Sequence, residues 1–260
     1  MLKYAHAPVV LAVIEVKHPR SDVSAGDAIA IKNVLRPTLP FHSSRDVTMR
    51  SLELTSSGAV EGPPATARWD YYDSRTRRTR FGTSAEATTV ETTEYDRWRV
   101  LLEVARTALT ARHEIAPLDG YWRVGLRYID EIRAPGDGQP DWERLIAPEF
   151  LPPRPDGGEL VPAQQNCVVQ YRTSKPGQTV TVRFGAVDAP PLVAGELRPD
   201  PPASGPYFLL DTDVAWGVQS GEPTPEMDVD VVCQMLDDLH SHASRMFEHV
   251  LTEQLRKGLT

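Results

Sequence analysis

The sequence predicts an α+β fold in which antiparallel sheet is backed by two long helices. Segments that alternate apolar and polar residues fill much of the chain before residue 95, with turn residues between them. Long helical patterns follow at residues 95–113 and 227–259. Strands are thus grouped before each helix, which favours α+β over α/β. We expect two related halves, residues 1–133 and 166–260, joined by a proline-rich connection at 134–165 and packed as one domain.

The first half is expected to open with a well-covered strand and a short helix. Residues 9–16 are β-branched and almost entirely apolar, which is typical of such a strand. In Ala25–Leu35 the apolar residues Ile29, Ala30 and Val34 recur at helical spacing, and the pattern stops just before a proline. The next segments have the alternation of an antiparallel meander. They are residues 47–54, 65–73, 79–84 and 87–93.

A helix, a long strand and an irregular connection are expected next. One apolar stripe runs through the helical pattern at 95–113, and residues 121–132 return to a strand pattern around Arg127. Between residues 134 and 162 the chain carries seven prolines. This connection leaves room only for a short helix around residues 142–146.

The second half is expected to contain a hairpin, a strand and a final helix. Residues 167–173 and 178–184 form the hairpin pattern, with Ser-Lys-Pro-Gly at its turn, and residues 207–216 form the last strand. Residues 227–259 are predicted to be one continuous helix with a buried apolar stripe. The stripe consists of Val232, Leu236, Leu239, Ala243, Met246 and Val250.

Composition narrows the classes of function. The chain has 260 residues, of which 40% are hydrophobic, so it is long enough to bury a core. Its formal net charge of −8 argues against attraction of the whole surface to nucleic acid or to an anionic membrane. The chain contains neither of the glycine-rich phosphate-binding motifs, so we expect no nucleotide cofactor.

The cysteines and the apolar segments point to the cytoplasm. Cys167 and Cys233 cannot build a disulfide framework, and neither has a zinc-site partner at the usual spacing. The apolar run at residues 8–14 is followed at once by Glu15 and Lys17, without the cleavage pattern of a signal peptide. No segment approaches the roughly 20 apolar residues of a membrane helix.

Charged residues on two strands are the first candidates for a site. Strand alternation places Arg127 on one face and Tyr128 and Asp130 on the other. Arg127 could anchor an anion or a partner, but an ion pair with an acid on the neighbouring strand is favoured. Asp211 and Asp213 share one face and could hold a divalent metal. Because no third ligand is identifiable, we predict no metal and expect these aspartates to pair with arginines such as Arg127.

Two further polar groups have simpler interpretations. Arg75, Arg77, Arg78 and Arg80 lie near aromatic residues, a combination that can follow a nucleic-acid backbone, but a turn with solvated charges is favoured. His240 and the other polar residues of the last helix are predicted to form an exposed face. Those residues are Asp237, Asp238, His242, Glu248 and His249.

Four segments together resemble a known family. They are residues 8–15, 125–130, 209–214 and 239–253. With these segments the chain resembles, over nearly its full length, the sporadically distributed bacterial family TIGR04255. The resemblance implies an accessory gene, of the defence or toxin-antitoxin type, and no particular activity. The chain departs from the family at Leu11, where an acidic residue is frequent, and at Asp130, where asparagine is common.

The sequence therefore favours a non-enzymatic module that binds a protein partner, because a well-specified scaffold carries no assembled catalytic set. A homodimer is a further expectation, since the last helix offers a long apolar stripe. The alternatives are a metal-dependent hydrolase or nuclease that uses Asp211 and Asp213, and RNA binding through Arg75–Arg80. The residues expected to take part in binding are Arg127, Tyr128, Asp130, Asp211, Asp213, Arg75, Arg77 and Arg78.

Overall fold

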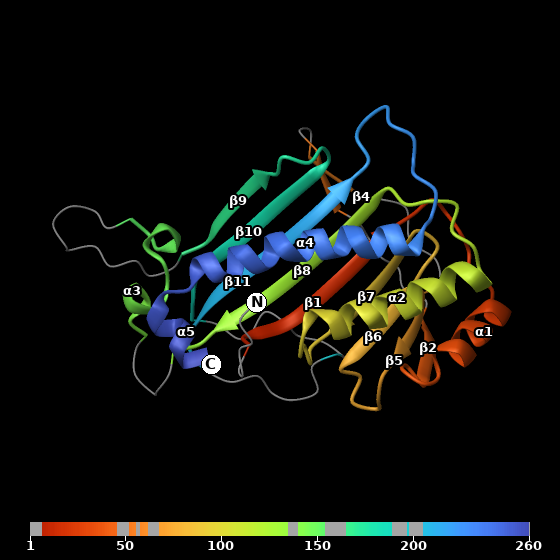
Figure 1. Ribbon diagram of the computed structural model, residues 1–260, viewed down its shortest axis with the longest axis horizontal. Helices are drawn as coiled ribbons and strands as arrows, with labels where there is room; N and C mark the ends of the chain where they lie inside the picture. Colours follow the sequence, from red (N-terminus) through yellow and green to blue (C-terminus); the bar gives the residue numbers. More distant parts are fainter. Residues whose placement is uncertain are drawn as a thin grey trace.

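A nine-stranded antiparallel sheet forms the centre of the molecule, and helices α2 (Trp98–Ile115) and α4 (Val229–Val250) lie across one of its faces (Figure 1). Its strands are β1 (Val9–Lys17), β2 (Phe41–Arg45), β5 (Arg68–Tyr72), β6 (Thr79–Thr83), β7 (Ala87–Thr92), β8 (Arg123–Ile132), β9 (Cys167–Arg172), β10 (Gln178–Val187) and β11 (Tyr207–Gly217). They are ordered β2-β5-β6-β7-β1-β8-β11-β10-β9, and all neighbours are antiparallel. The predicted α+β class with antiparallel sheet is confirmed.

The remaining elements are short and lie around this sheet. They are helix α1 (Ala25–Leu35), the hairpin β3 (Leu52–Thr55) and β4 (Gly58–Glu61), helix α3 (Trp142–Leu145), the 3-10 turn η1 (Pro148–Phe150) and helix α5 (Glu253–Leu259). The computed structural model describes residues 7–45, 52–55, 58–61, 68–134, 140–153, 165–188, 197 and 205–259. Within these residues, no helix combines the length and the apolar character needed to cross a membrane.

Helix α1 has the predicted extent but buries a different face. Ser24 and Asp27 form a capping box, which explains why the helix begins where it does. The predicted stripe included Ile29 and Val34, yet these side chains are 55% and 51% exposed. The helix instead turns another row of side chains towards the protein. The buried residues are Ala28, Ile31 and Leu35.

Strand β8 lies in the middle of the sheet and has a different character on each side. It pairs with β1 and with β11, so that Val13, Arg127 and Asp213 are in register across three strands. The alternation predicted from the sequence is confirmed, since Leu126, Tyr128 and Asp130 face α4 and α2 while Arg127 faces away. We call the side away from these helices the far face.

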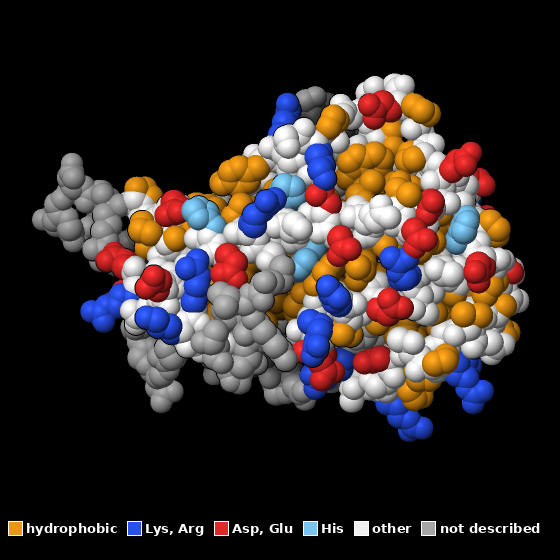
Figure 2. Space-filling model, viewed as in Figure 1, with side chains coloured by type: hydrophobic (Ala, Val, Ile, Leu, Met, Phe, Trp, Pro, Cys, Tyr) orange, Lys and Arg blue, Asp and Glu red, His pale blue; other side chains and the backbone are white. Residues whose placement is uncertain are grey.

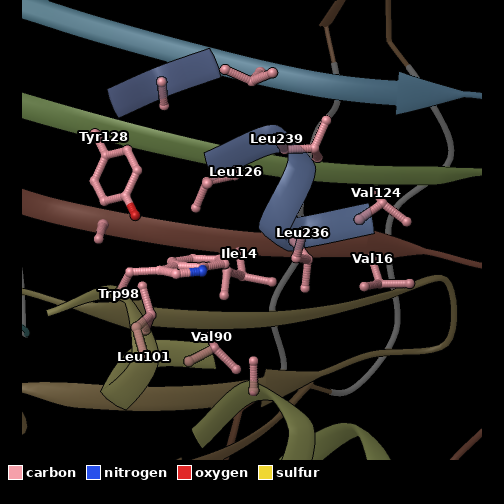
Figure 3. Packing of buried hydrophobic residues seen from close by; sticks show 14 of the residues in the cluster. Ile14, Val16, Val90, Trp98, Leu101, Val124, Leu126, Tyr128, Leu236 and Leu239 are labelled. Carbon is pink, nitrogen blue, oxygen red and sulfur yellow. The ribbon is translucent and has the colours of Figure 1, made fainter. Parts of the chain in front are cut away.

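The core fills the space between the sheet and its two covering helices (Figure 3). Leu236 and Leu239 of α4 lie over Val124 and Leu126 of β8, and all four side chains are fully buried. Truncating one such leucine to alanine typically costs about 2–5 kcal/mol. This packing holds α4 in place against the centre of the sheet.

The final helical segment is broken, so the prediction of one continuous helix is wrong. α4 ends at Val250, and Leu251 is extended because it forms a β-bridge with Ile146. Thr252 then starts α5, with its hydroxyl accepting from the Leu255 amide and its carbonyl accepting from the Arg256 amide. The break therefore results from a pairing with a distant segment, and Thr252 supplies the cap for a new helix.

The meander prediction is wrong in two places: it lacked β2, and its segment 47–54 overlaps β3, which pairs with β4 outside the nine-stranded sheet. β6 and β7 agree with the predicted segments, whereas β2 was not anticipated because its sequence, Phe-His-Ser-Ser-Arg, is mostly polar. β5 begins at Arg68. The predicted residues 47–51 and 65–67 lie outside the described part of the chain.

Candidate functional site

A cavity of about 760 Å³ lies between the N-terminal half of α2 and the middle of α4, above β1 and β8. Hydrophobic side chains are visible in the hollow between these helices, with acidic and basic side chains around it (Figure 2). The apolar and aromatic part of its wall consists of Val9, Tyr95, Trp98, Leu102, Tyr128 and Phe247. We call this space the interhelical cavity. A mostly apolar cavity of this size with a few polar groups is typical of a ligand site.

Three elements bring the polar groups of the cavity together. Tyr128 and Asp130 are two residues apart on β8 and therefore point to the same side. Trp98 is the first residue of α2, and Figure 3 shows it beside Tyr128. His240 comes from α4, four residues after the buried Leu236, and so lies on the stripe that faces the sheet.

These side chains form a continuous network of contacts. The Tyr128 hydroxyl donates to the Tyr95 hydroxyl at 3.4 Å and is 3.1 Å from Nδ1 of His240. The Trp98 indole stacks on the His240 ring, with centroids 4.5 Å apart, and donates its N–H to Asp237 at 2.5 Å. The rings of Tyr95 and Tyr128 meet edge to face at 5.3 Å. The walls of the cavity are therefore held in fixed positions.

Two buried polar atoms of residues that line the cavity have no hydrogen-bond partner among the described residues. They are Oδ1 of Asp130 and Nε2 of His240. Asp130 is 2% exposed and His240 is 7% exposed. Most buried polar atoms in proteins are paired, so two unpaired atoms lining one cavity are informative. Burial raises the pKa of Asp130 to about 8 and lowers the pKa of His240 to about 4. Both side chains are therefore mainly uncharged near neutral pH.

The cavity does not contain a connected catalytic relay. Asp237, His240 and Ser244 all line it. However, Asp237 accepts from Trp98, and His240 uses Nδ1 for Tyr128, so the serine, histidine and aspartate are not linked in the order that nucleophilic catalysis needs. Among the described residues there is also no group of three or more histidine, cysteine, aspartate or glutamate side chains that could hold a metal.

The predicted ion pair is present on the far face. Arg127 binds Asp211 through two parallel hydrogen bonds, each 2.7 Å long, and Arg183 approaches the same carboxylate at 3.3 Å. Asp213 is 3.5 Å from Arg123, which also binds Glu15. The prediction that Arg127 pairs with Asp211 or Asp213 is thus confirmed, with Asp211 as the partner.

A glycine makes room for one of these arginines. The guanidinium of Arg123 lies across Gly125, where an added Cβ would come within 2.7 Å of its Nη1 atom.

The predicted site residues lie on two different faces of the sheet. Arg127, Asp211 and Asp213 lie together on the far face, while Tyr128 and Asp130 line the interhelical cavity.

The arginine cluster lies at the predicted turn, between β5 and β6. Arg77 has a positive φ of 57° and places its guanidinium 4.9 Å from the centre of the Tyr72 ring. Arg80 belongs to β6 and pairs with Glu91. Arg75, Arg77 and Arg78 are not among the residues that line the interhelical cavity.

The sequence did not identify three residues of the cavity wall, namely Tyr95, Trp98 and His240. The prediction that His240 belongs to an exposed face is wrong, because Trp98 covers its ring. A usable signal existed, since His240 continues the buried stripe one turn after Leu236. Tyr95 and Trp98 carried no comparable signal, because an aromatic residue at the start of a helix is more often part of a core.

The comparisons with known proteins add no relative. A scan against protein-family models finds no match to this chain, and a search of the curated proteins finds no similar sequence. The functional argument therefore rests on the geometry of the interhelical cavity.

Proposed function

We propose that this chain is a non-enzymatic binding module whose ligand site is the interhelical cavity. The observation that carries the proposal is the pair of unpartnered buried atoms, Asp130 Oδ1 and His240 Nε2, on the wall of a largely apolar space. An unsatisfied buried polar atom costs about 1–3 kcal/mol. A ligand that reaches both atoms removes this cost while it covers the aromatic wall, so the arrangement of the wall favours binding.

We propose that the partner is a protein that places a side chain or a short segment in the cavity. We also propose a cytoplasmic location and membership of the TIGR04255 family, on the residues that carry the resemblance. The metal-dependent hydrolase ranks lower, because the carboxylate of Asp211 already binds Arg127 and Arg183, which compete with a cation. RNA binding through Arg75–Arg80 also ranks lower, because of the acidic total charge.

We further infer that the chain consists of two related halves, each backed by one long helix, with β8 and α3 in the second half instead of in the predicted first half (1–133) and connection (134–165). The order of elements supports this: β1, α1, the meander β5-β6-β7 and α2 are followed by β8, α3, the meander β9-β10-β11 and α4. The strand order agrees, because β7 neighbours β1 while β11 neighbours β8. The two halves then meet at β1 and β8, beneath the cavity, which is a frequent position for a ligand site.

A fragment screen by saturation-transfer NMR tests the proposed function with two matched serine variants of α4. Ser244 lines the cavity, whereas Ser241 is exposed outside it. We expect aromatic fragments to bind the wild type and Ser241→Trp, and to lose binding in Ser244→Trp, where the indole fills the cavity. Circular dichroism establishes that both variants are folded. A wild type that binds no fragment, or equal binding by both variants, contradicts the proposal.

A further inference from the structure

We infer that the interhelical cavity takes an organic cation, with an ammonium, amidinium or guanidinium head on an apolar body, and that Asp130 is its counter-ion. This inference rests on the proposed function and names the ligand class for the same site. It follows from three properties of the wall: the hydrogen-bonding direction of its unpartnered atoms, its aromatic rings, and its balance of charge.

Both unpartnered atoms are suited to accept hydrogen bonds. With the Tyr128 hydroxyl hydrogen directed to Tyr95, the Tyr128 oxygen is left to accept from His240, and we infer that the histidine carries its hydrogen on Nδ1. A neutral histidine with its hydrogen on Nδ1 has a lone pair on Nε2. The ionised carboxylate of Asp130 also only accepts. A ligand that satisfies both atoms must therefore carry at least two N–H or O–H donors, as ammonium and guanidinium groups do.

The rings near these atoms suit a positive charge. Tyr95, Trp98 and Tyr128 all line the cavity, and the π-faces of tyrosine and tryptophan attract cations within about 6 Å. A buried carboxylate without a cationic partner is strongly disfavoured, whereas a paired and hydrogen-bonded one is tolerated. An organic cation supplies the missing charge, and its apolar body covers Leu102 and Phe247.

Three of the arginines near the mouth already have partners and do not supply that charge. Each of three described guanidinium groups near the mouth has a carboxylate of its own: Arg97 pairs with Asp96, Arg106 with Asp230, and Arg256 with Glu248. An anionic ligand meets Asp130 and Asp237 at the wall, which disfavours it. The ionisable groups that line the cavity are Tyr95, Asp96, Arg97, Arg99, Glu103 and Arg106 from α2 and the segment before it, Tyr128 and Asp130 from β8, and Asp237, His240 and Glu248 from α4.

Proton release accompanies binding of a cation. Because burial raises the pKa of Asp130 to about 8, this side chain is mainly protonated below that pH. A cation stabilises the ionised form, so the proton leaves as the ligand enters. The affinity should therefore rise with pH and level off above the pKa.

Isothermal titration calorimetry with three probes of equal length tests the inference. The probes are 2-phenylethylammonium, the neutral 2-phenylethanol and the anionic phenylacetate. At about pH 8.5 we expect the ammonium to bind at least about tenfold more tightly than the alcohol, and the anion to bind most weakly. With the pKa of Asp130 at about 8, the ammonium should lose about 20-fold in affinity at about pH 6.5, while the alcohol should not.

Two isosteric variants provide the control. Asp130→Asn keeps the shape of the wall but cannot ionise, so it should remove both the preference for the ammonium and its pH dependence. Asp213→Asn changes a carboxylate on the far face and should preserve both. If fragments occupy the cavity but the ammonium has no advantage, or if Asp130→Asn retains that advantage, the cation inference is overturned while the proposed function stands. An empty fragment screen overturns the proposed function itself.

The head group can belong to a free amine or to a lysine of the proposed protein partner, and a second arm distinguishes them. A blocked Gly-Gly-Lys-Gly-Gly peptide is compared with the same peptide carrying norleucine, and with the free amine. Tighter binding of the lysine peptide than of the amine identifies a partner side chain, and the reverse order identifies a small molecule. Equal affinity of the lysine and norleucine peptides counts against a cation.

Discussion

Buried carboxyl groups on the two faces of the central strands differ in whether they have hydrogen-bond partners. On the far face the Asp211 side chain is only 5% exposed, yet it binds two arginines. On the covered face Asp130, one residue from the register partner of Asp211, is as deeply buried, and its Oδ1 atom has no hydrogen-bond partner in the described part of the chain. Two aspartates on the neighbouring strands β11 and β8 thus differ in how their surroundings satisfy them.

This difference separates structural polar groups from candidate functional ones. Arg127 and Asp211 satisfy one another within the sheet, so their contacts explain why they are there without any ligand. Asp130 and His240 have unsatisfied atoms beside a cavity, so the folded chain alone does not explain them. The comparison therefore places function under the helices and stability on the far face, and each prediction below tests it.

The largest effect is expected at Trp98, which belongs both to the core and to the cavity wall. Trp98→Ala removes a buried indole that stacks on His240, and should lower the free energy of unfolding by about 3–5 kcal/mol. Urea denaturation measures this change. The matched control is Trp122→Ala, because Trp122 is 40% exposed and outside the cavity. Comparable losses in the two variants would show that the covered face has no special role.

The next effect is a pH dependence that should disappear in Asp130→Asn. The raised pKa of Asp130, about 8, keeps it protonated in the folded chain, while the unfolded carboxyl ionises near pH 4. Unfolding thus releases one proton between about pH 6.5 and 8, so the free energy of unfolding should fall by about 2 kcal/mol over this range.

Below about pH 6.5 the titration of His240 changes the free energy of unfolding in the direction opposite to that of Asp130. Its lowered pKa, about 4, keeps it neutral in the folded chain, so the unfolded histidine gains a proton as the unfolded Asp130 loses one, and the two contributions cancel between about pH 4 and 6.5. Denaturation curves at several pH values should show the decline in the wild type and in Asp213→Asn only. A parallel decline in Asp130→Asn contradicts the assignment.

On the far face, breaking the ion pair should cost less than losing Trp98. Arg127→Met leaves the nearly buried Asp211 with Arg183 alone, and because Arg127 is itself 44% exposed we expect a loss of about 1–2 kcal/mol. The double variant Arg127→Met with Asp211→Leu should recover much of this loss, since no carboxylate then remains unpaired. Chemical denaturation of the single and double variants measures it. A double variant less stable than the single one contradicts a purely structural pair.

The smallest effect is expected at the mouth of the cavity. Arg97 and Asp96 form an ion pair in which both side chains are more than half exposed. Arg97→Gln should change the free energy of unfolding by less than about 0.5 kcal/mol, because water screens the pair. Thermal denaturation at low and moderate salt checks this. A larger loss would show that the cost of removing a charge depends on the face of the sheet on which it lies, and not on how deeply it is buried.

Local patterns were sufficient for most elements. The alternation along β8 and the apolar stripe of α4 are each visible within a few residues, because strands and helices repeat every 2 and 3.6 residues. The same alternation placed Arg127 opposite to Tyr128 and Asp130. It also placed Asp211 and Asp213 on one face.

Tertiary structure decided which of these residues meet. Arg127 takes Asp211 because β8 and β11 are neighbours, and Trp98 contacts Asp237 across 139 positions of sequence. The end of α4 at Val250 depends on the bridge between Leu251 and Ile146. Such contacts are set by how the helices pack on the sheet, and no short-range period encodes them. The sequence alone therefore determined which side chains of β8 and β11 share a face, while the packing of α2 and α4 on the sheet created the cavity and left Asp130 and His240 with unsatisfied atoms among the described residues.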